Sequence, residues 1–450
     1  MKHKWMAVVL LAATALPVAS RAQQAADGLF DHLRSATPGQ LARADGREQA
    51  PQKPVLIAQL VAEALENNPE IQAARREWEA AQQRVLPAGA LDDPMLEAGI
   101  VNLPAESLSF RREDMTMKMI GLAQRLPYPG KRRLRQDLAA KDAESIGHGY
   151  QETVNRVIRD VKLAYFDLAL VVESARLVER NKRILEQFLQ IAEARYAVGQ
   201  GSQTDVLKAQ TQLSRMNDEL IRLARERETI EAELGRALGR KPGSLALLPE
   251  MPPLQETALQ PEALREMAIK GRPQLLALQS LIARSEKALD LARQEYYPDF
   301  DVRLSYGQRD RMPDGAPRED MVSLTVAINL PVWRETKRAP RVAEAVAMRE
   351  QASEMYEAQL NELTARLRQQ VAAAEQNLRS ARLYETGILP QARLAVEAAL
   401  AAYRVNRVDF FTLLDNQMTV FNFEIAHATA LVGYRKALAE VDFLTGKQAF

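Results

Sequence analysis

Four short segments of the chain alternate between apolar and polar residues with a period of two. They cover residues 95–101, 115–126, 300–306 and 322–330, and the alternation is clearest in the last two. A strand turns successive side chains to opposite faces, so this pattern predicts four strands, each with one apolar and one polar face. Each segment is also close to the ~10 residues that a tilted strand needs to cross a bilayer.

Helical spacing of apolar residues accounts for most of the remaining chain. Residues 56–85 predict one helix, and residues 131–197 contain no proline and predict a helix on the order of 100 Å long. A third, heptad-patterned helix follows. The long helix carries two interleaved seven-residue series, which predicts contacts on two flanks, as for a stave in a barrel. These series are Val157, Ala164, Val171, Val178, Leu185 and Ala192, and Leu163, Leu170, Leu177, Ile184 and Ile191.

The chain contains an internal duplication, because short motifs recur at a nearly constant offset. We therefore expect two structural repeats, residues 55–240 and 261–446, each with a helix, two strands and two long helices. A proline-rich linker, residues 241–260, joins them, and residues 447–450 form the C-terminal end. The matched motifs are Asn68-Pro69 with Arg272-Pro273 and Leu126-Pro127 with Leu330-Pro331, 204 positions apart, and Tyr196 with Tyr403, 207 positions apart.

The first 22 residues have the pattern of a secretory signal peptide. Two lysines precede an apolar stretch from Met6 to Leu16, and Ser20-Arg21-Ala22 fits the small-x-small site of a signal peptidase. The apolar stretch is well below the ~20 residues of a membrane-spanning helix. We expect residues 1–22 to direct export and to be removed, which leaves an N-terminal segment, residues 23–54, before the first repeat.

A short turn separates the two long helices of each repeat. In the first repeat it contains Val198-Gly199-Gln200-Gly201, and Ser202 then stands three residues before Asp205, the spacing of a capping box. Asp409 occupies the equivalent capping position in the second repeat. A Gly-x-Gly sequence can also mark a phosphate loop, but the third glycine and the preceding strand are missing here. The pattern therefore favours a helix–turn–helix tip.

The order of these elements and several short motifs resemble the TolC family of outer-membrane efflux proteins over nearly the whole chain. The motifs are Asn68-Pro69-Glu70 and the two tips, residues 196–207 and 403–409. The segment Leu126-Pro-Tyr-Pro-Gly-Lys-Arg132 resembles the CzcC-like branch, which serves heavy-metal efflux. The resemblance implies a mainly α protomer with a small β part. Its long helices would join an α-barrel, and its four strands would join a trimeric 12-stranded outer-membrane β-barrel.

The same resemblance implies partners and functional residues. The partners would be a homotrimer, outer-membrane lipid, a periplasmic adaptor (membrane-fusion) protein and an inner-membrane RND pump. The family closes its periplasmic entrance with rings of Asp where the last helix begins; here Asp415 matches the second Asp and Thr412 replaces the first. Such a ring would favour cations, and a surface Asp in a helix first turn is the alternative. The adaptor would dock on Val198, Gly199, Gln200, Gly201, Val405, Asn406, Arg407 and Val408.

Composition and charge narrow the classes of function. The 60 basic and 59 acidic residues leave a net charge of +1 with no basic stripe, which argues against nucleic-acid binding. With no cysteine, the chain has no disulfide, no thiolate nucleophile and no cysteine for the N-terminal lipid anchor that many relatives carry. No nucleophile–base–acid set, nucleotide motif or metal-spaced cluster emerges, so we expect neither an enzyme, a cofactor nor a bound metal.

Histidines and methionines are the remaining candidates for metal chemistry. The four histidines are scattered, and His427 falls on an apolar heptad series of the last helix, which favours a structural role. Met115, Met117 and Met119 alternate on one predicted strand face. Thioethers bind Cu(I), but an apolar face toward lipid or lumen is the simpler interpretation.

The leading hypothesis is the exit duct of a tripartite RND-type efflux system, set in the outer membrane with a periplasmic extension and exporting divalent heavy-metal cations. A TolC-like duct for drug efflux or type I protein secretion is the alternative within the same fold. A soluble periplasmic coiled-coil scaffold is the alternative from another class. The two strand pairs argue against the scaffold, because a purely helical scaffold has no use for them.

Overall fold

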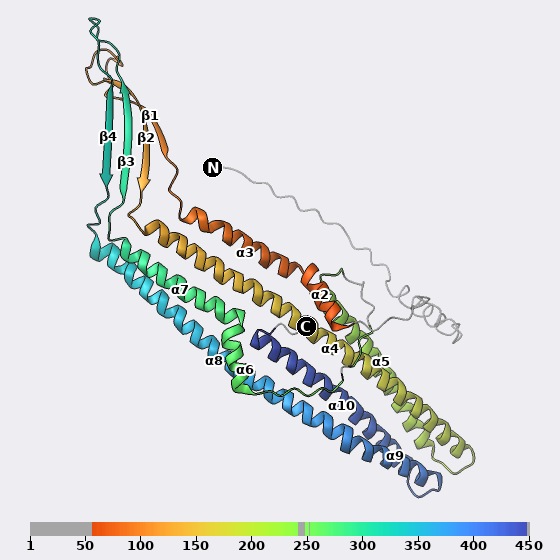
Figure 1. Cartoon of the computed structure of the whole chain (residues 1–450). Helices are drawn as coiled ribbons and strands as arrows, with labels where there is room; N and C mark the ends of the chain where they lie inside the picture. Colours follow the sequence, from red (N-terminus) through yellow and green to blue (C-terminus); the bar gives the residue numbers. More distant parts are fainter. Residues whose placement is uncertain (1–55, 242–247, 252, 448–450) are drawn as a thin grey trace, which may run out of the picture. The chain divides into compact units, whose positions relative to one another are not determined.

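The computed structural model describes residues 56–241, 248–251 and 253–447 (Figure 1). The predicted signal peptide, the segment 23–54, part of the linker and residues 448–450 lie outside this part of the chain. A helix pair, a strand pair and long helices follow one another twice in the same order. The elements are α2 (Ile57–Asn67), α3 (Pro69–Ala88), β1 (Met95–Val101), β2 (Met117–Leu126), α4 (Lys131–Ala197), α5 (Gln203–Leu238), α6 (Pro261–Gly271), α7 (Pro273–Gln294), β3 (Phe300–Gln308), β4 (Met321–Ile328), η1 (Arg334–Arg338), α8 (Ala339–Leu383), η2 (Tyr384–Ile388), α9 (Leu389–Arg404) and α10 (Phe410–Thr445).

The four strands form one antiparallel sheet in the order β1-β2-β3-β4. β2 pairs with β3, so the two halves of the chain meet inside the sheet. The register places residues of similar polarity side by side on neighbouring strands. One row across the sheet is apolar, and the next row, on the opposite face, is polar or small. The first row is Leu96, Leu122, Leu304 and Leu324; the second is Glu97, Gly121, Ser305 and Ser323. The prediction of two-faced strands is confirmed.

Two strands are shorter than the alternating pattern predicted. β2 begins at Met117 rather than Met115, because the Thr116 hydroxyl donates a hydrogen bond to the Asn102 carbonyl (2.7 Å) and holds this stretch in the loop between β1 and β2. β4 ends at Ile328. The Asn329 N–H still donates to the Asp299 carbonyl (3.3 Å), but the Asp299 N–H donates to the side-chain oxygen of Asn329 (2.5 Å). The alternation of apolar and polar residues along a strand cannot by itself reveal such side-chain contacts.

The single helix expected over residues 56–85 is wrong, since α2 and α3 are separated at Asn68. A residue before proline avoids the helical region, and Asn68 is extended with φ −69° and ψ 122°. Its side chain accepts hydrogen bonds from the N–H groups of Glu70 (2.8 Å) and Ile71 (3.1 Å), which caps α3. Arg272 interrupts α6 and α7 with the same extended backbone.

The longest helix, α4, spans the predicted residues and forms the centre of the helical layer. It packs against α5, α7, α3 and α10 (Figure 1). Its first predicted series is almost wholly buried, in one apolar cluster with residues of α2, α5, α9 and α10. In the second series Leu177 is buried, but the other members are only partly covered. One flank of α4 is thus packed within the chain, and the other is only partly so.

The second repeat departs from the prediction of an unbroken long helix after each hairpin. Here α8 passes into the wide π turn η2 before α9 begins. The physical reason is Pro390. Proline has no backbone N–H to donate to the carbonyl four residues earlier in the helix, and its ring would clash with that carbonyl. A π turn accommodates the break. Within the described ranges, no helix combines the length and the hydrophobicity needed to cross a bilayer.

Candidate gate, docking tips and strand–helix junction

The two helix–turn–helix tips lie at the end of the helices away from the sheet (Figure 1). They repeat one turn geometry, with Gly199 at φ 72° and Asn406 at φ 61° in the left-handed region. The Arg195 guanidinium donates to the Tyr403 carbonyl (2.6 Å) and lies 4.5 Å from the centre of its ring, which ties the tips together. All predicted docking residues are exposed except Gly201 and Val408, which are half-buried.

Polar caps start the helix that follows each tip, as predicted. The Ser202 hydroxyl accepts a hydrogen bond from the Thr204 N–H (3.1 Å). Asp409 accepts hydrogen bonds from the Thr412 N–H (2.9 Å) and from the Thr412 hydroxyl (2.6 Å). Both hydrogen bonds lower the pKa of the Asp409 carboxyl, and the one from the Thr412 hydroxyl lowers it more. Thr412 is therefore engaged in capping α10.

Asp415 is exposed in the second turn of α10 and makes no ion pair with any residue of the described chain. Leu413, Leu414 and Gln417 beside it are buried, so the orientation of this face of α10 is held by packing. The structure thus places Thr412 and Asp415 on neighbouring turns near the tip. Asp415 belongs to no metal-binding cluster within the described chain, where no set of three or more His, Cys, Asp or Glu residues could hold a metal ion.

A buried polar contact lies behind this face and was not predicted. The Gln417 amide donates to the Asn181 side-chain oxygen on α4 (2.8 Å), and both residues are more than 90% buried. The Asn181 amide points to the sulfur atoms of Met216 (3.5 Å) and Met418 (3.7 Å). The signal in the sequence that could have revealed this contact was an amide residue among apolar heptad positions, because such residues fix the register of packed helices.

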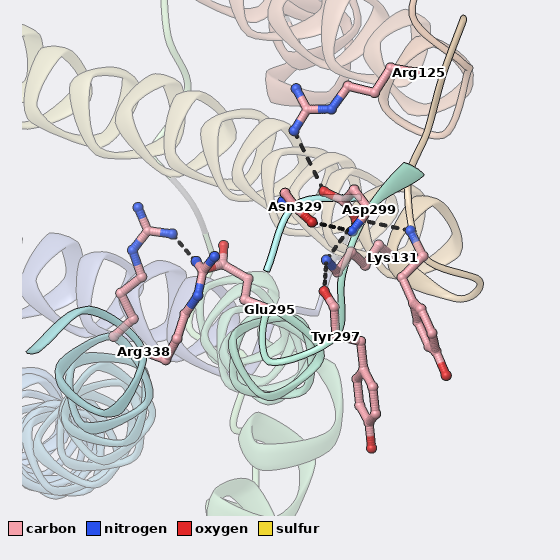
Figure 2. Close-up of polar contacts among 9 residues, drawn as sticks. Arg125, Lys131, Glu295, Tyr297, Asp299, Asn329 and Arg338 are labelled. Atoms are coloured by element: carbon pink, nitrogen blue, oxygen red, sulfur yellow. Dashed lines mark hydrogen bonds and ion pairs between the residues drawn. The ribbon is translucent and has the colours of Figure 1, made fainter. Parts of the chain in front are cut away.

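A second unpredicted feature is an ion pair at the junction between strands and helices (Figure 2). The Lys131 ammonium at the start of α4 donates to the Asp299 carboxylate (2.7 Å) and to the Tyr297 carbonyl (2.8 Å). The Tyr128 N–H donates to the same carboxylate (2.9 Å), and Arg125 lies 3.5 Å from it. Lys131 is 4% exposed and Asp299 9%, so the pair is buried.

The pKa of Asp299 reflects this environment. Burial alone would raise it, but the hydrogen bonds from Lys131 and from the Tyr128 backbone bind the ionised form and lower the pKa overall. Lys131 belongs to the segment that resembles the CzcC-like branch. Asp299 belongs to none of the sequence motifs described above, so the pair was not predicted. Glu295 forms an ion pair with Arg338 of η1 (3.0 Å; Figure 2). It forms a second ion pair with Arg341 at the start of α8.

The two faces of the sheet differ in chemistry. The polar face carries an ion pair between Glu97 and Arg303 (3.0 Å). The other face is a continuous apolar surface, in contact with water in the single chain. Its largest side chains are Leu96, Ile100, Ile120, Leu122, Leu304, Tyr306, Val322, Leu324, Val326 and Ile328. An exposed apolar surface of this extent marks an interaction with lipid or protein.

The sequence profile of the family described as "Outer membrane efflux protein" matches residues 60–240 and 264–447, which is most of the chain. This chain belongs to the outer membrane efflux protein family. Its members are channel proteins of the outer membrane, so the chain is an outer-membrane efflux channel protein and not an enzyme. The prediction of a TolC-type protein is confirmed.

Individual relatives agree with this family. The chain is 22% identical to the cobalt-zinc-cadmium resistance protein CzcC of Cupriavidus metallidurans over 88% of this chain and 90% of the relative. It is 25% identical to the outer membrane protein TolC of Vibrio cholerae over 80% of this chain and 83% of the relative. A crystal structure of CusC superimposes with a TM-score of 0.75, at 12% identity, over 88% of this chain and 93% of that chain, and shares the fold.

Proposed function

We propose that this family member is the exit duct of a tripartite RND-type efflux system and that its cargo is divalent heavy-metal cations. The observation that supports the duct is the sheet, in which a continuous apolar face lies opposite a polar face that carries an ion pair. An apolar face suits lipid and a polar face suits a water-filled lumen. Residues 1–22 would direct export, with residues 55–240 and 261–446 as the two structural repeats.

The duct requires three copies of the chain. One chain contributes four strands, and β1 and β4 are its outermost strands. Backbone groups at such edges cannot remain unpaired in lipid, and four strands are too few to close a sheet on themselves. Three copies would close twelve strands, while the partly covered flank of α4 would meet the next copy. The exposed tips would then dock a periplasmic adaptor that links the duct to an inner-membrane pump.

A metal cargo is supported by the similarity to CzcC and by the segment 126–132. Deletion of the gene should sensitise the host to cobalt, zinc or cadmium more than to detergents and dyes, and the wild-type gene should restore resistance. A phenotype confined to drugs, as expected for the alternative of a drug-efflux duct, would replace the metal cargo and leave the duct in place.

The gate is proposed at Asp415 on the start of α10. Three copies of this exposed carboxylate would attract cations and repel anions, with Thr412 next to the ring but bound to the helix cap. Asp415→Asn should raise single-channel conductance in a planar bilayer and weaken cation selectivity. Glu354→Gln, which removes an exposed carboxylate from α8 far from the tips, is the control. Unchanged selectivity in Asp415→Asn would remove the gate assignment.

The docking role of the tips is tested best at Val198 and Val405, which are 69% and 63% exposed. Their replacement by aspartate should abolish metal resistance while the trimer persists, because the exposed apolar contacts are lost without disturbing the core. Gly199→Asn is the control, since the equivalent Asn406 already adopts the left-handed conformation. Full resistance in the aspartate variants would place docking elsewhere.

A further inference from the structure

Three methionines gather at the end of the sheet away from the helices, on the polar face. They are Met117 and Met119 on β2 and Met321 on β4. We propose that these thioethers, seated over Gly307 of β3, form a binding site for a soft monovalent cation, Cu(I) or Ag(I). This site is additional to the proposed gate and is independent of which cargo the duct carries.

The register of the sheet places two of these side chains on either side of a glycine. Met119 is the partner of Gly307, and Gly307 is the partner of Met321. Neighbouring strands lie ~4.8 Å apart, so the two methionine Cα atoms are about 10 Å apart, and the β3 residue between them has no side chain. Gly99 of β1 occupies the next position in the same row. Glycines thus leave open the space beside both methionines.

The third thioether fills the gap between the other two. The Met117 sulfur lies only 2.5 Å from the point that a Cβ atom on Gly307 would occupy, so it rests directly on this glycine. A methionine has three rotatable bonds and reaches across several ångströms. Met119 and Met321 can therefore direct their sulfur atoms toward that of Met117. Met321 is 38% exposed, so an ion can reach the site from solvent.

The placement of the methionines argues against a merely apolar role. Every methionine that pairs across the sheet lies on the same face. This is the face that carries the Glu97–Arg303 ion pair, Ser305 and Ser323. The apolar face is built from leucine, isoleucine, valine and aromatic residues instead. Thioethers are uncharged, soft ligands that select Cu(I) over harder divalent ions. They carry no proton, so an ion need not displace one to bind.

Ag(I), which is stable to oxidation, is the probe that tests the site on the purified full-length protein in detergent. The chain has no cysteine, so no thiolate competes for the ion. Met117→Leu/Met119→Leu/Met321→Leu removes the three sulfur atoms and nearly conserves their volume. The control is Met267→Leu/Met348→Leu/Met355→Leu, which removes three exposed methionines from α6 and α8.

Equilibrium dialysis with metal analysis should show that wild type and control bind one Ag(I) per chain at least ten times more tightly than the cluster variant. Equal binding by all three proteins would overturn the proposal. An equal loss of Zn(II) binding in the cluster variant would also overturn it. Thioethers are poor ligands for this harder ion, so their removal should leave Zn(II) binding unchanged. Since binding is measured without transport, a failed duct or cargo assignment would not affect this result.

A single-residue variant tests the geometry and leaves all methionines in place. A Cβ atom in Gly307→Ala would meet the flexible Met117 side chain and push its sulfur away, so Ag(I) affinity should fall at least three-fold while the fold is kept. Gly99→Ala, in the same row, meets nothing within 4 Å and should bind Ag(I) like wild type. Unchanged affinity in Gly307→Ala would contradict the seat over this glycine.

Discussion

The buried ion pair between Lys131 and Asp299 joins the start of α4 to the start of β3, at the point where strands meet helices (Figure 2). Its carboxylate has a lowered pKa in the folded chain. A lowered folded-state pKa contributes stability that is complete above the ordinary value of 3.8 and is lost as the pH falls through the folded value. The junction is therefore stable at neutral and mildly acidic pH and weakens only in strong acid.

Lys131→Met should destabilise the protein at neutral pH, because it leaves the Asp299 carboxylate buried without its cation. Removing one partner of such a pair costs about 3–5 kcal/mol. We expect a lower melting temperature by circular dichroism, and a difference from wild type that shrinks as the pH falls below about 4. Lys141→Met, which breaks an exposed pair with Glu144, should cost at most ~1 kcal/mol. Equal melting temperatures for both variants would contradict a structural role for the junction.

Among the helices, the contact between Asn181 and Gln417 aligns α4 with α10. Asn181→Leu alone leaves the buried Gln417 amide without this partner, which costs about 1–3 kcal/mol. The double variant Asn181→Leu/Gln417→Leu should recover much of that loss, since apolar groups then replace both partners. Thermal melting of the two single variants and the double variant gives the coupling energy. Additive losses would show that the two amides act independently.

For the molecule as a whole, the two faces of the sheet predict how it sits in a membrane. Leu324 and Ser323 are neighbours on β4 that belong to opposite faces. Leu324→Arg should sharply reduce assembled protein in the outer-membrane fraction, because arginine on a lipid-facing strand costs about 2–4 kcal/mol near the midplane. Ser323→Arg faces the polar side and should assemble normally. Equal yields of the two variants would mean that the apolar face does not meet lipid.

The features that depend on local chemistry could be predicted from the sequence alone. The bounds of α4, the four alternating strands and the caps Ser202 and Asp409 follow from periodicity and from side chains that bond to nearby backbone. The duplication and the tip motifs were sufficient to predict the family. The separation of α2 from α3 could also have been predicted, since proline restricts the preceding residue.

Contacts between residues far apart in the chain became known only from the folded structure. Asp299 and Lys131 lie 168 positions apart, and Asn181 and Gln417 lie 236 apart, so no periodicity links either pair. The methionine site likewise depends on strand register, because a shift of one residue would move Met119 to the other face. Side chains at such sites are paired by the folding of the whole chain, and that pairing carries no local signal in the sequence.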